Sequence, residues 1–179
     1  MNMLAAKRSI VGTAALCFLG IGTGVLLPQA QAQTTRQQQS PEVRRLLETK
    51  QCAGCNLSGA NLQDADLDDA NLRGANLQGA NLQSADLEKA NLQGANLQQA
   101  NLSGADLDEA NLQGASLQQA NLSGADLQKA NLQNANLQNA NLFRADLEDA
   151  NLQGTNLEGA NLQGADLEGT IRANQNTRN

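Results

Sequence analysis

The residues best suited to chemistry are a cysteine pair and a set of regularly spaced carboxylates. Cys52 and Cys55 form a Cys-x-x-Cys pair, a spacing found in redox-active dithiols, half zinc sites and structural disulfides. The chain holds eighteen Asp and Glu residues but no His, Trp or Tyr. Without His, the sequence excludes His-dependent metal sites and Ser-His-Asp hydrolysis. It also has no phosphate-binding loop, and we therefore expect a protein that is not an enzyme.

Six of the carboxylates recur at intervals of twenty residues, from Asp66 to Asp166. This twenty-residue interval is a multiple of a shorter, five-residue repeat. Leu recurs every five residues from Leu57 to Leu167, 23 times without a gap, almost always preceded by Ala and then Asn or Asp. On an α-helix, residues five apart rotate by about 140° and form no stripe, and on a strand they alternate between faces. Only a chain that turns a corner every five residues keeps all these Leu side chains on one interior. Four such corners close a coil of twenty residues.

Residues 55–169, with their repeated Ala-(Asn/Asp)-Leu-x-x unit, resemble the pentapeptide-repeat family. The resemblance implies an all-β fold, a right-handed quadrilateral parallel β-helix of about 5.75 coils at four repeats per coil. It also implies that the central Leu and the small Ala point inward. Gly fills the last position of the repeat eleven times, which suits a tight turn with unusual backbone angles.

In a four-sided coil the twenty-residue interval places the carboxylates on one face. With Lys89 and Lys129 as its only cations, this predicted acidic face comprises fourteen residues: Asp66, Asp68, Asp69, Asp86, Glu88, Asp106, Asp108, Glu109, Asp126, Asp146, Glu148, Asp149, Asp166 and Glu168.

Three interpretations of the acidic face are open. The simplest is a solvated negative surface that keeps the rod soluble. Asp106 and Asp126, about 4.8 Å apart in such a stack, could also flank a weakly held Ca²⁺; no other cofactor is expected. The third is mimicry of DNA, because some members of the family inhibit DNA gyrase in this way. The net charge of −6 itself argues against a nucleic-acid partner.

The cysteines precede the first regular repeat. Carried back by five residues, the register places Cys52 at a Leu position and Cys55 at an Ala position, so both should point inward. Asn56 stands where haem attachment requires His, and zinc lacks further ligands. A disulfide closing the first coil, a thiol-redox pair and reduced buried thiols all remain open, and an oxidising compartment favours the disulfide.

The N-terminus has the regions of a secretory signal peptide. Lys7 and Arg8 precede an apolar run that Pro28 ends, and Ala30-Gln31-Ala32 is a cleavage pattern. We expect a signal peptide at 1–32 cut after Ala32, with an uncleaved anchor as the alternative. Residues 33–39 are then a flexible linker, and 40–54 a capping helix followed by the Cys-x-x-Cys turn. Cleavage would leave no stable membrane anchor and an exported protein, in the periplasm or, given the family's abundance in photosynthetic bacteria, the thylakoid lumen.

The C-terminal end of the repeats has no comparable cover. Ile171 stands one position early for a central residue, and 170–179 reads as a polar tail. Open strand edges favour an end-to-end homodimer, and family members that dimerise do so through this terminus. Candidate interface residues are Phe143, Arg144 and Ile171. The sequence as a whole predicts an exported scaffold for an unknown protein partner. A DNA-mimic inhibitor of an enzyme such as gyrase, if cytoplasmic, and a thiol-redox module using Cys52 and Cys55 are the alternatives.

Overall fold

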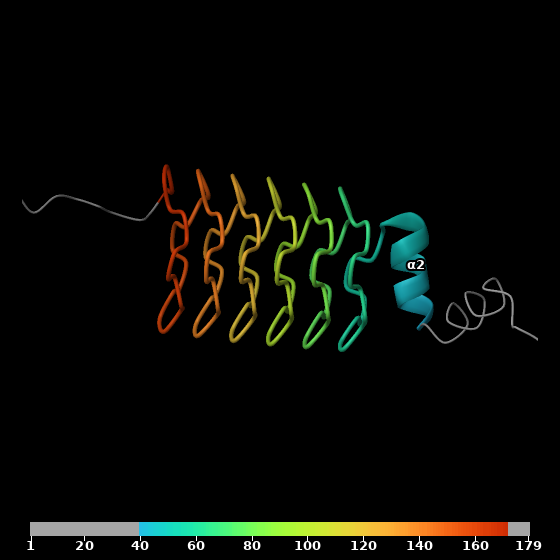
Figure 1. The fold of residues 1–179 in the computed structure, drawn as a ribbon. Coiled ribbons are helices and arrows are strands. Elements are labelled where there is room, and N and C mark those ends of the chain that lie inside the picture. The colour runs from blue at the N-terminus through green and yellow to red at the C-terminus, as the bar shows by residue number, and fades with distance from the viewer. Residues whose placement is uncertain (1–39, 172–179) are drawn as a thin grey trace, which may run out of the picture.

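The chain folds into a rod of stacked coils. The computed structural model describes residues 40–171, and Figure 1 shows the coils following one another along the rod with the helix α2 at one end. Parallel bridges join residues twenty apart, such as Asn56 to Asn76 and Asp66 to Asp86. Many backbone N–H groups therefore find their acceptors in a neighbouring coil: Leu57 N donates to Asn76 O at 2.7 Å, and Asn76 N donates to Cys55 O at 2.8 Å. The predicted β-helical solenoid is confirmed.

The interior of the rod is a column of Leu and Ala side chains. The Leu residues from Leu57 to Leu147 are at most 1% exposed, and the Ala residues from Ala70 to Ala150 are equally inaccessible. No polar or charged residue among those described is buried. Since a buried Leu contributes about 2 kcal/mol, the strict repetition of Leu holds the stack together.

Each corner is a tight turn with one residue in the left-handed backbone region. The turn closes when the Ala N–H donates to the Leu carbonyl three residues earlier, as Ala115 does to Leu112 at 3.0 Å. Gly114 in this turn has a φ of +66°, as the sequence predicts for the recurring Gly. Twelve residues other than Gly take the same conformation at the corners, Lys89 and Glu109 among them. The turn is therefore set by the fold and not by Gly alone.

Three outer faces carry ladders of amide side chains. Asn101 Nδ2 donates to Asn81 Oδ1 at 3.1 Å, and Asn121 Nδ2 donates to Asn101 Oδ1 at 3.1 Å. Gln93, Gln113 and Gln133 form a similar series on the opposite face, and on the face between them Asn96 Nδ2 donates to Asn76 Oδ1 at 3.2 Å. Each rung links two coils, so these side chains support the stack from outside.

The helix α2, Pro41–Thr49, covers the N-terminal end of the core. The Ser40 side chain accepts a hydrogen bond from Val43 N at 3.2 Å, and Pro41 occupies the first turn, where its missing N–H costs nothing. Val43 and Leu46 are buried in the same cluster as the first coil. The helix ends at Lys50, whose N–H donates to Leu46 O at 2.7 Å.

The opposite end has no such cover within residues 40–171. Leu157, Leu162 and Leu167 are only partly buried, and Ile171 is 57% exposed. Ile171 bridges to Asn151, so it occupies an outward position of the repeat, one place early as the sequence indicates. The predicted signal peptide, linker and most of the polar tail lie outside the described residues. None of the described helical structure is long and apolar enough to cross a membrane.

Candidate functional site

The acidic face is built on one column of bridged residues. Parallel bridges link Asp66, Asp86, Asp106, Asp126, Asp146 and Asp166 in succession. Each Asp from Asp86 onward orients its carboxylate by accepting the backbone N–H two residues later, as Asp106 Oδ1 does from Asp108 N at 3.0 Å. One oxygen is thus engaged at the turn. The same local bond is made by Asn on the other faces, which explains why either residue fits the position.

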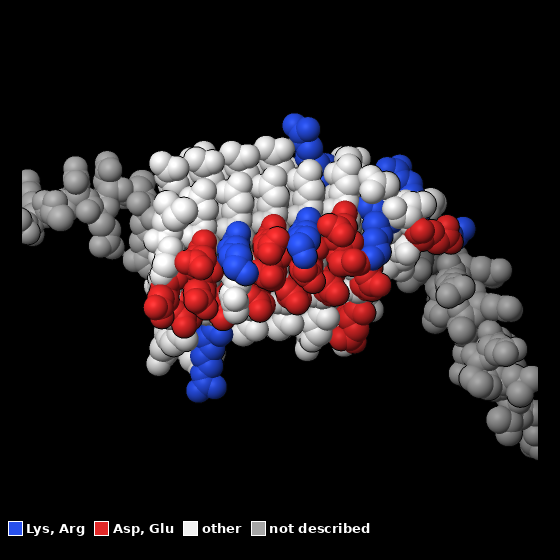
Figure 2. Space-filling model, turned by 90° about the horizontal axis from the view of Figure 1, so that it is seen from above, with Lys and Arg blue, Asp and Glu red and all other residues white. Residues whose placement is uncertain are grey.

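The carboxylates form a continuous band along the rod. Figure 2 shows Asp and Glu side chains running the length of the stack, bordered by surface without charge on one side. The structure thus gathers the residues that the twenty-residue interval places together. In contrast to the core residues, none of these carboxylate residues is buried.

On the acidic face, the residue at the last position of the turn alternates between negative and positive charge from one coil to the next. Asp69, Lys89, Glu109, Lys129 and Asp149 succeed one another, all with positive φ between 52° and 58°. A hydrogen bond from Lys89 to Glu88 raises the pKa of Lys89, with further contributions from the charges of Glu88, Glu109 and Asp69. This alternation was not predicted from the repeat pattern, although the absence of Gly at these five positions is a signal of it.

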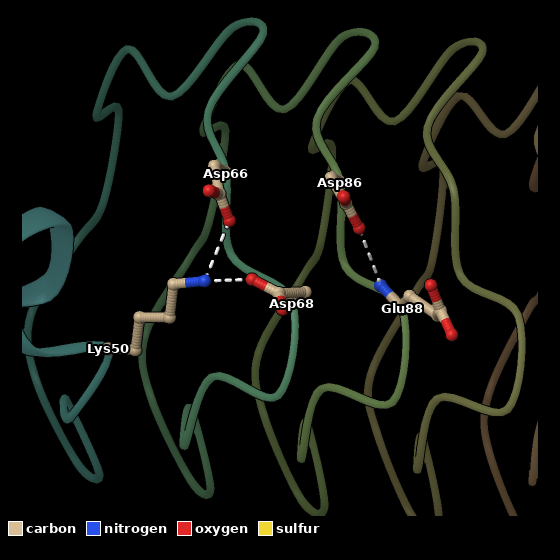
Figure 3. A network of polar contacts seen from close by, with 5 residues as sticks. All are labelled: Lys50, Asp66, Asp68, Asp86 and Glu88. Atoms are coloured by element: carbon tan, nitrogen blue, oxygen red, sulfur yellow. Dashed lines mark hydrogen bonds and ion pairs between the residues drawn. The ribbon is translucent and has the colours of Figure 1, made fainter.

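A third lysine, Lys50, lies on the acidic face. Figure 3 shows its side chain reaching from the end of α2 to Asp66 and Asp68 in the first coil. The Nζ atom lies 2.7 Å from Asp66 Oδ1 and also contacts Asp68. The prediction of only two cations on this face was therefore wrong. The register of the repeats could not reveal Lys50 because the side chain belongs to the cap.

No cluster of three or more metal-binding side chains occurs within residues 40–171. The two-carboxylate calcium site at Asp106 and Asp126 therefore stays a prediction. Nearby, Asp108 Oδ1 is inaccessible and has no hydrogen-bond partner among the described atoms.

Cys52 and Cys55 form a disulfide at the junction of the cap and the first coil. Their Cα atoms lie 5.2 Å apart, and the two residues are 0% and 4% exposed. Cys52 Sγ lies 3.5 Å from the carbonyl oxygen of Glu42 in α2. Both cysteines point inward, as the register predicts. A thiol-redox module requires accessible cysteines, and the closed cap does not provide them.

The three candidate interface residues are not brought together. Phe143 is half-buried and Arg144 lies over its ring, 5.0 Å from the centroid, so the aromatic ring is partly covered by its neighbour. Ile171 lies at the uncapped end of the rod. Of the three, only Ile171 is a large exposed apolar residue.

The repeats match a known family. The model of the pentapeptide repeats matches residues 51–88, 85–124, 105–142 and 140–171. The chain belongs to the pentapeptide-repeat family. Proteins of this family are generally structural or interaction scaffolds and not enzymes.

Several solved structures of the family are similar to the chain. HetL from the cyanobacterium Nostoc sp. strain PCC 7120, involved in heterocyst differentiation regulation, is 40% identical over 68% of this chain, with a TM-score of 0.46. The match covers 61% of HetL. Rfr23 from Cyanothece 51142 is 35% identical over 74% of this chain and 97% of its own length, with a TM-score of 0.37.

A pentapeptide repeat protein from the Arabidopsis thaliana thylakoid lumen is 33% identical, with 65% of each chain covered and a TM-score of 0.31. No curated protein matches the chain.

Proposed function

We propose that the protein is an exported scaffold whose acidic face docks a basic protein surface. The observation that carries the proposal is the band of fourteen carboxylate residues, none of them buried and partly offset by three lysines, along one side of the rod. Because the rod is built from repeated coils, it presents this charge as an extended and regular array. Such a field attracts a partner of opposite charge and orients it during approach.

Export rests on the sequence before the rod. A positive stretch, an apolar run and an Ala-x-Ala pattern precede residue 33, as in secretory signals. One similar protein comes from the thylakoid lumen, which supports a lumenal or periplasmic location. The intact mass of protein recovered from fractionated cells tests this. A chain that begins at Gln33 and lacks two hydrogens relative to free thiols fits the proposal, whereas full-length protein in the cytoplasm contradicts it and favours DNA mimicry.

Docking is tested by site-specific photocrosslinking in the native compartment. A photoreactive residue replaces the exposed Glu148 on the acidic face or, as the matched control, the exposed Gln153 on the next face along the same coil. We expect crosslinks to a basic protein from position 148 only. The purified partner should then bind the rod with an affinity that falls steeply with salt concentration, because the attraction is electrostatic.

A variant that removes charge without altering the turns completes the docking test. Asp86→Asn, Asp106→Asn and Asp126→Asn together keep the oxygen that accepts the local backbone N–H, as Asn does on the other faces. We expect this triple variant to bind the partner at least about tenfold more weakly, since rim charges each contribute modestly. Equal crosslinking from both faces, or affinity independent of salt, would overturn the proposal.

The uncapped end supports a second proposal, an end-to-end homodimer. Leu157, Leu162 and Leu167 are partly buried and Ile171 is exposed, and their strand edges have no neighbouring coil within residues 40–171. A second copy could cover both the apolar side chains and the backbone edge. We expect light scattering to show a dimer that Ile171→Lys shifts to monomer, with Leu47→Lys, at the exposed surface of α2, as the control. A monomer at high micromolar concentration in the unaltered protein contradicts it.

A further inference from the structure

We propose that the Cys52–Cys55 disulfide and α2 together form a redox-sensitive cap. A dithiol reductant would reach the disulfide only when α2 lifts from the first coil, and the reduced cap would open more readily than the oxidised one. This inference concerns the N-terminal end of the rod and does not depend on what the acidic face binds.

The disulfide lies in the contact between α2 and the coil. Val43 and Leu46 of the helix belong to the same buried cluster as both cysteines. The Glu42 carbonyl oxygen lies 3.5 Å from Cys52 Sγ, and neither cysteine is more than 4% exposed. Thiol–disulfide exchange requires a thiolate to approach one sulfur along the S–S axis. With α2 in place, that approach is blocked.

The helix is the element most easily detached. It has nine residues, fewer than an isolated helix needs to be stable in water. The helix is attached to the rod by two buried apolar side chains, by Lys50, whose ion pairs with Asp66 and Asp68 are partly exposed, and by an exposed hydrogen bond from Arg45 Nε to Gln51 O at 2.8 Å. Each coil between the first and the last, by contrast, is bonded to the coils on both sides of it. Local opening should therefore concentrate at the cap.

The exchange is a two-electron transfer between sulfur atoms. One thiolate of the dithiol attacks a cysteine sulfur, the Cys52–Cys55 bond breaks and a mixed disulfide forms. The second thiol of the reductant then attacks its own bridged sulfur and releases the remaining cysteine. The dithiol leaves as a disulfide, and two protons end on Cys52 and Cys55.

Opening and reduction are linked thermodynamically. If lifting α2 favours reduction, reduction must favour lifting α2 to the same extent. The physical reason is that the disulfide holds the turn beneath the helix in one shape, and the free thiols allow that turn more conformations. Lys50 stands directly between α2 and this turn, so opening would also free it from Asp66 and Asp68.

The kinetics of reduction test whether α2 controls access to the disulfide. Protein comprising residues 33–179, with the disulfide verified by intact mass, is treated with dithiothreitol and quenched by alkylation. Mass spectrometry then gives the fraction of reduced protein at each time. We expect Leu46→Ala, which weakens the packing of α2 on the first coil, to accelerate reduction at least about tenfold. Val43→Ala should act in the same direction. The matched control is Leu157→Ala at the far end of the rod, which should leave the rate unchanged.

Hydrogen exchange tests the second half of the proposal. On reduction we expect residues 41–49 to lose protection, while the coils from residue 71 to 150 keep theirs. Cys52→Ser with Cys55→Ser should reproduce the reduced pattern. Three results would each contradict the proposal of a redox-sensitive cap. These are equal reduction rates in the unaltered protein and Leu46→Ala, unchanged protection of α2 on reduction, and free thiols in protein from the native compartment. None of these results bears on crosslinking from position 148, so the docking proposal and the cap proposal fail separately.

Discussion

Lys89 has an environment unlike that of the exposed amides on the other faces. It is bonded to Glu88, and Asp69 and Glu109 occupy the same turn position in the coils on either side. These partners raise the pKa of Lys89 above its ordinary value of 10.5. A raised folded-state pKa means that the lysine stabilises the fold fully below its unfolded pKa and ceases to do so as the pH rises through the folded value.

We therefore expect Lys89→Gln to lower the melting temperature by a small and constant amount from pH 6 to 9. The difference should shrink in the alkaline range above the ordinary lysine pKa, as the native Lys89 loses its proton. Thermal scans of both proteins across this range measure the effect, with Glu88→Gln in each background isolating the pair. A difference that grows with pH would contradict the assignment.

Turn glycines differ in the room they have for a side chain. Gly114 has φ +66° and open space where a Cβ would stand, whereas a Cβ on Gly154 would lie 3.3 Å from Asn134 Cγ and closer still to Asn134 Oδ1. We expect Gly114→Ala to cost about 1 kcal/mol through backbone strain alone. Gly154→Ala should cost more, roughly 2 kcal/mol, since Asn134 must also move. Chemical denaturation checks both, and Ser84→Gly, the reverse change at a positive φ, should be neutral or slightly stabilising.

At the scale of the element, the Asn ladder should contribute to the stability of the stacked coils. Asn101 donates to Asn81 and accepts from both Asn121 and the N–H of Ser103. Asn101→Ala removes all three bonds, and we expect a loss of about 1 to 2 kcal/mol in the free energy of unfolding. Asn101→Asp keeps the acceptor and removes only the donor, so it should cost less. Equal losses in the two variants would show that the bond donated to Asn81 accounts for the whole effect and that the bonds accepted from Asn121 and Ser103 contribute little.

The elements differ in how far the sequence determines them. The coils were predictable because every repeat places Leu, and almost every repeat places Ala, at the same position, and no helix or strand satisfies that period. The start of α2 was predictable from Ser40 and Pro41. The contact of Lys50 with Asp66 and Asp68 was not, because it depends on where the side chain leaves the end of the helix. The half-burial of Phe143 depends on the packing of its neighbour Arg144, which the repeat pattern does not describe.

At the scale of the whole molecule, the fold and the acidic face obey different periods. The core repeats every five residues, so any deletion of a multiple of five leaves Leu and Ala in register. The face repeats every twenty residues, so only a deletion of twenty keeps the Asp column continuous. The rod should therefore tolerate changes that destroy its charged surface, a property that separates stability from binding.

Two deletions use this difference. Removing residues 101–105 joins Ala100 to Asp106, so Asp106 and all later carboxylates move by one side of the coil and no longer follow Asp86. Removing residues 91–110 joins Ala90 to Asn111 and shortens the face without breaking it. We expect both proteins to fold, with the longer deletion lowering the denaturant m-value by about a sixth. If an extended acidic array binds the partner, the five-residue deletion should weaken binding far more than the twenty-residue deletion, although it removes fewer carboxylates. The opposite order would mean that the number of charges matters and their alignment does not.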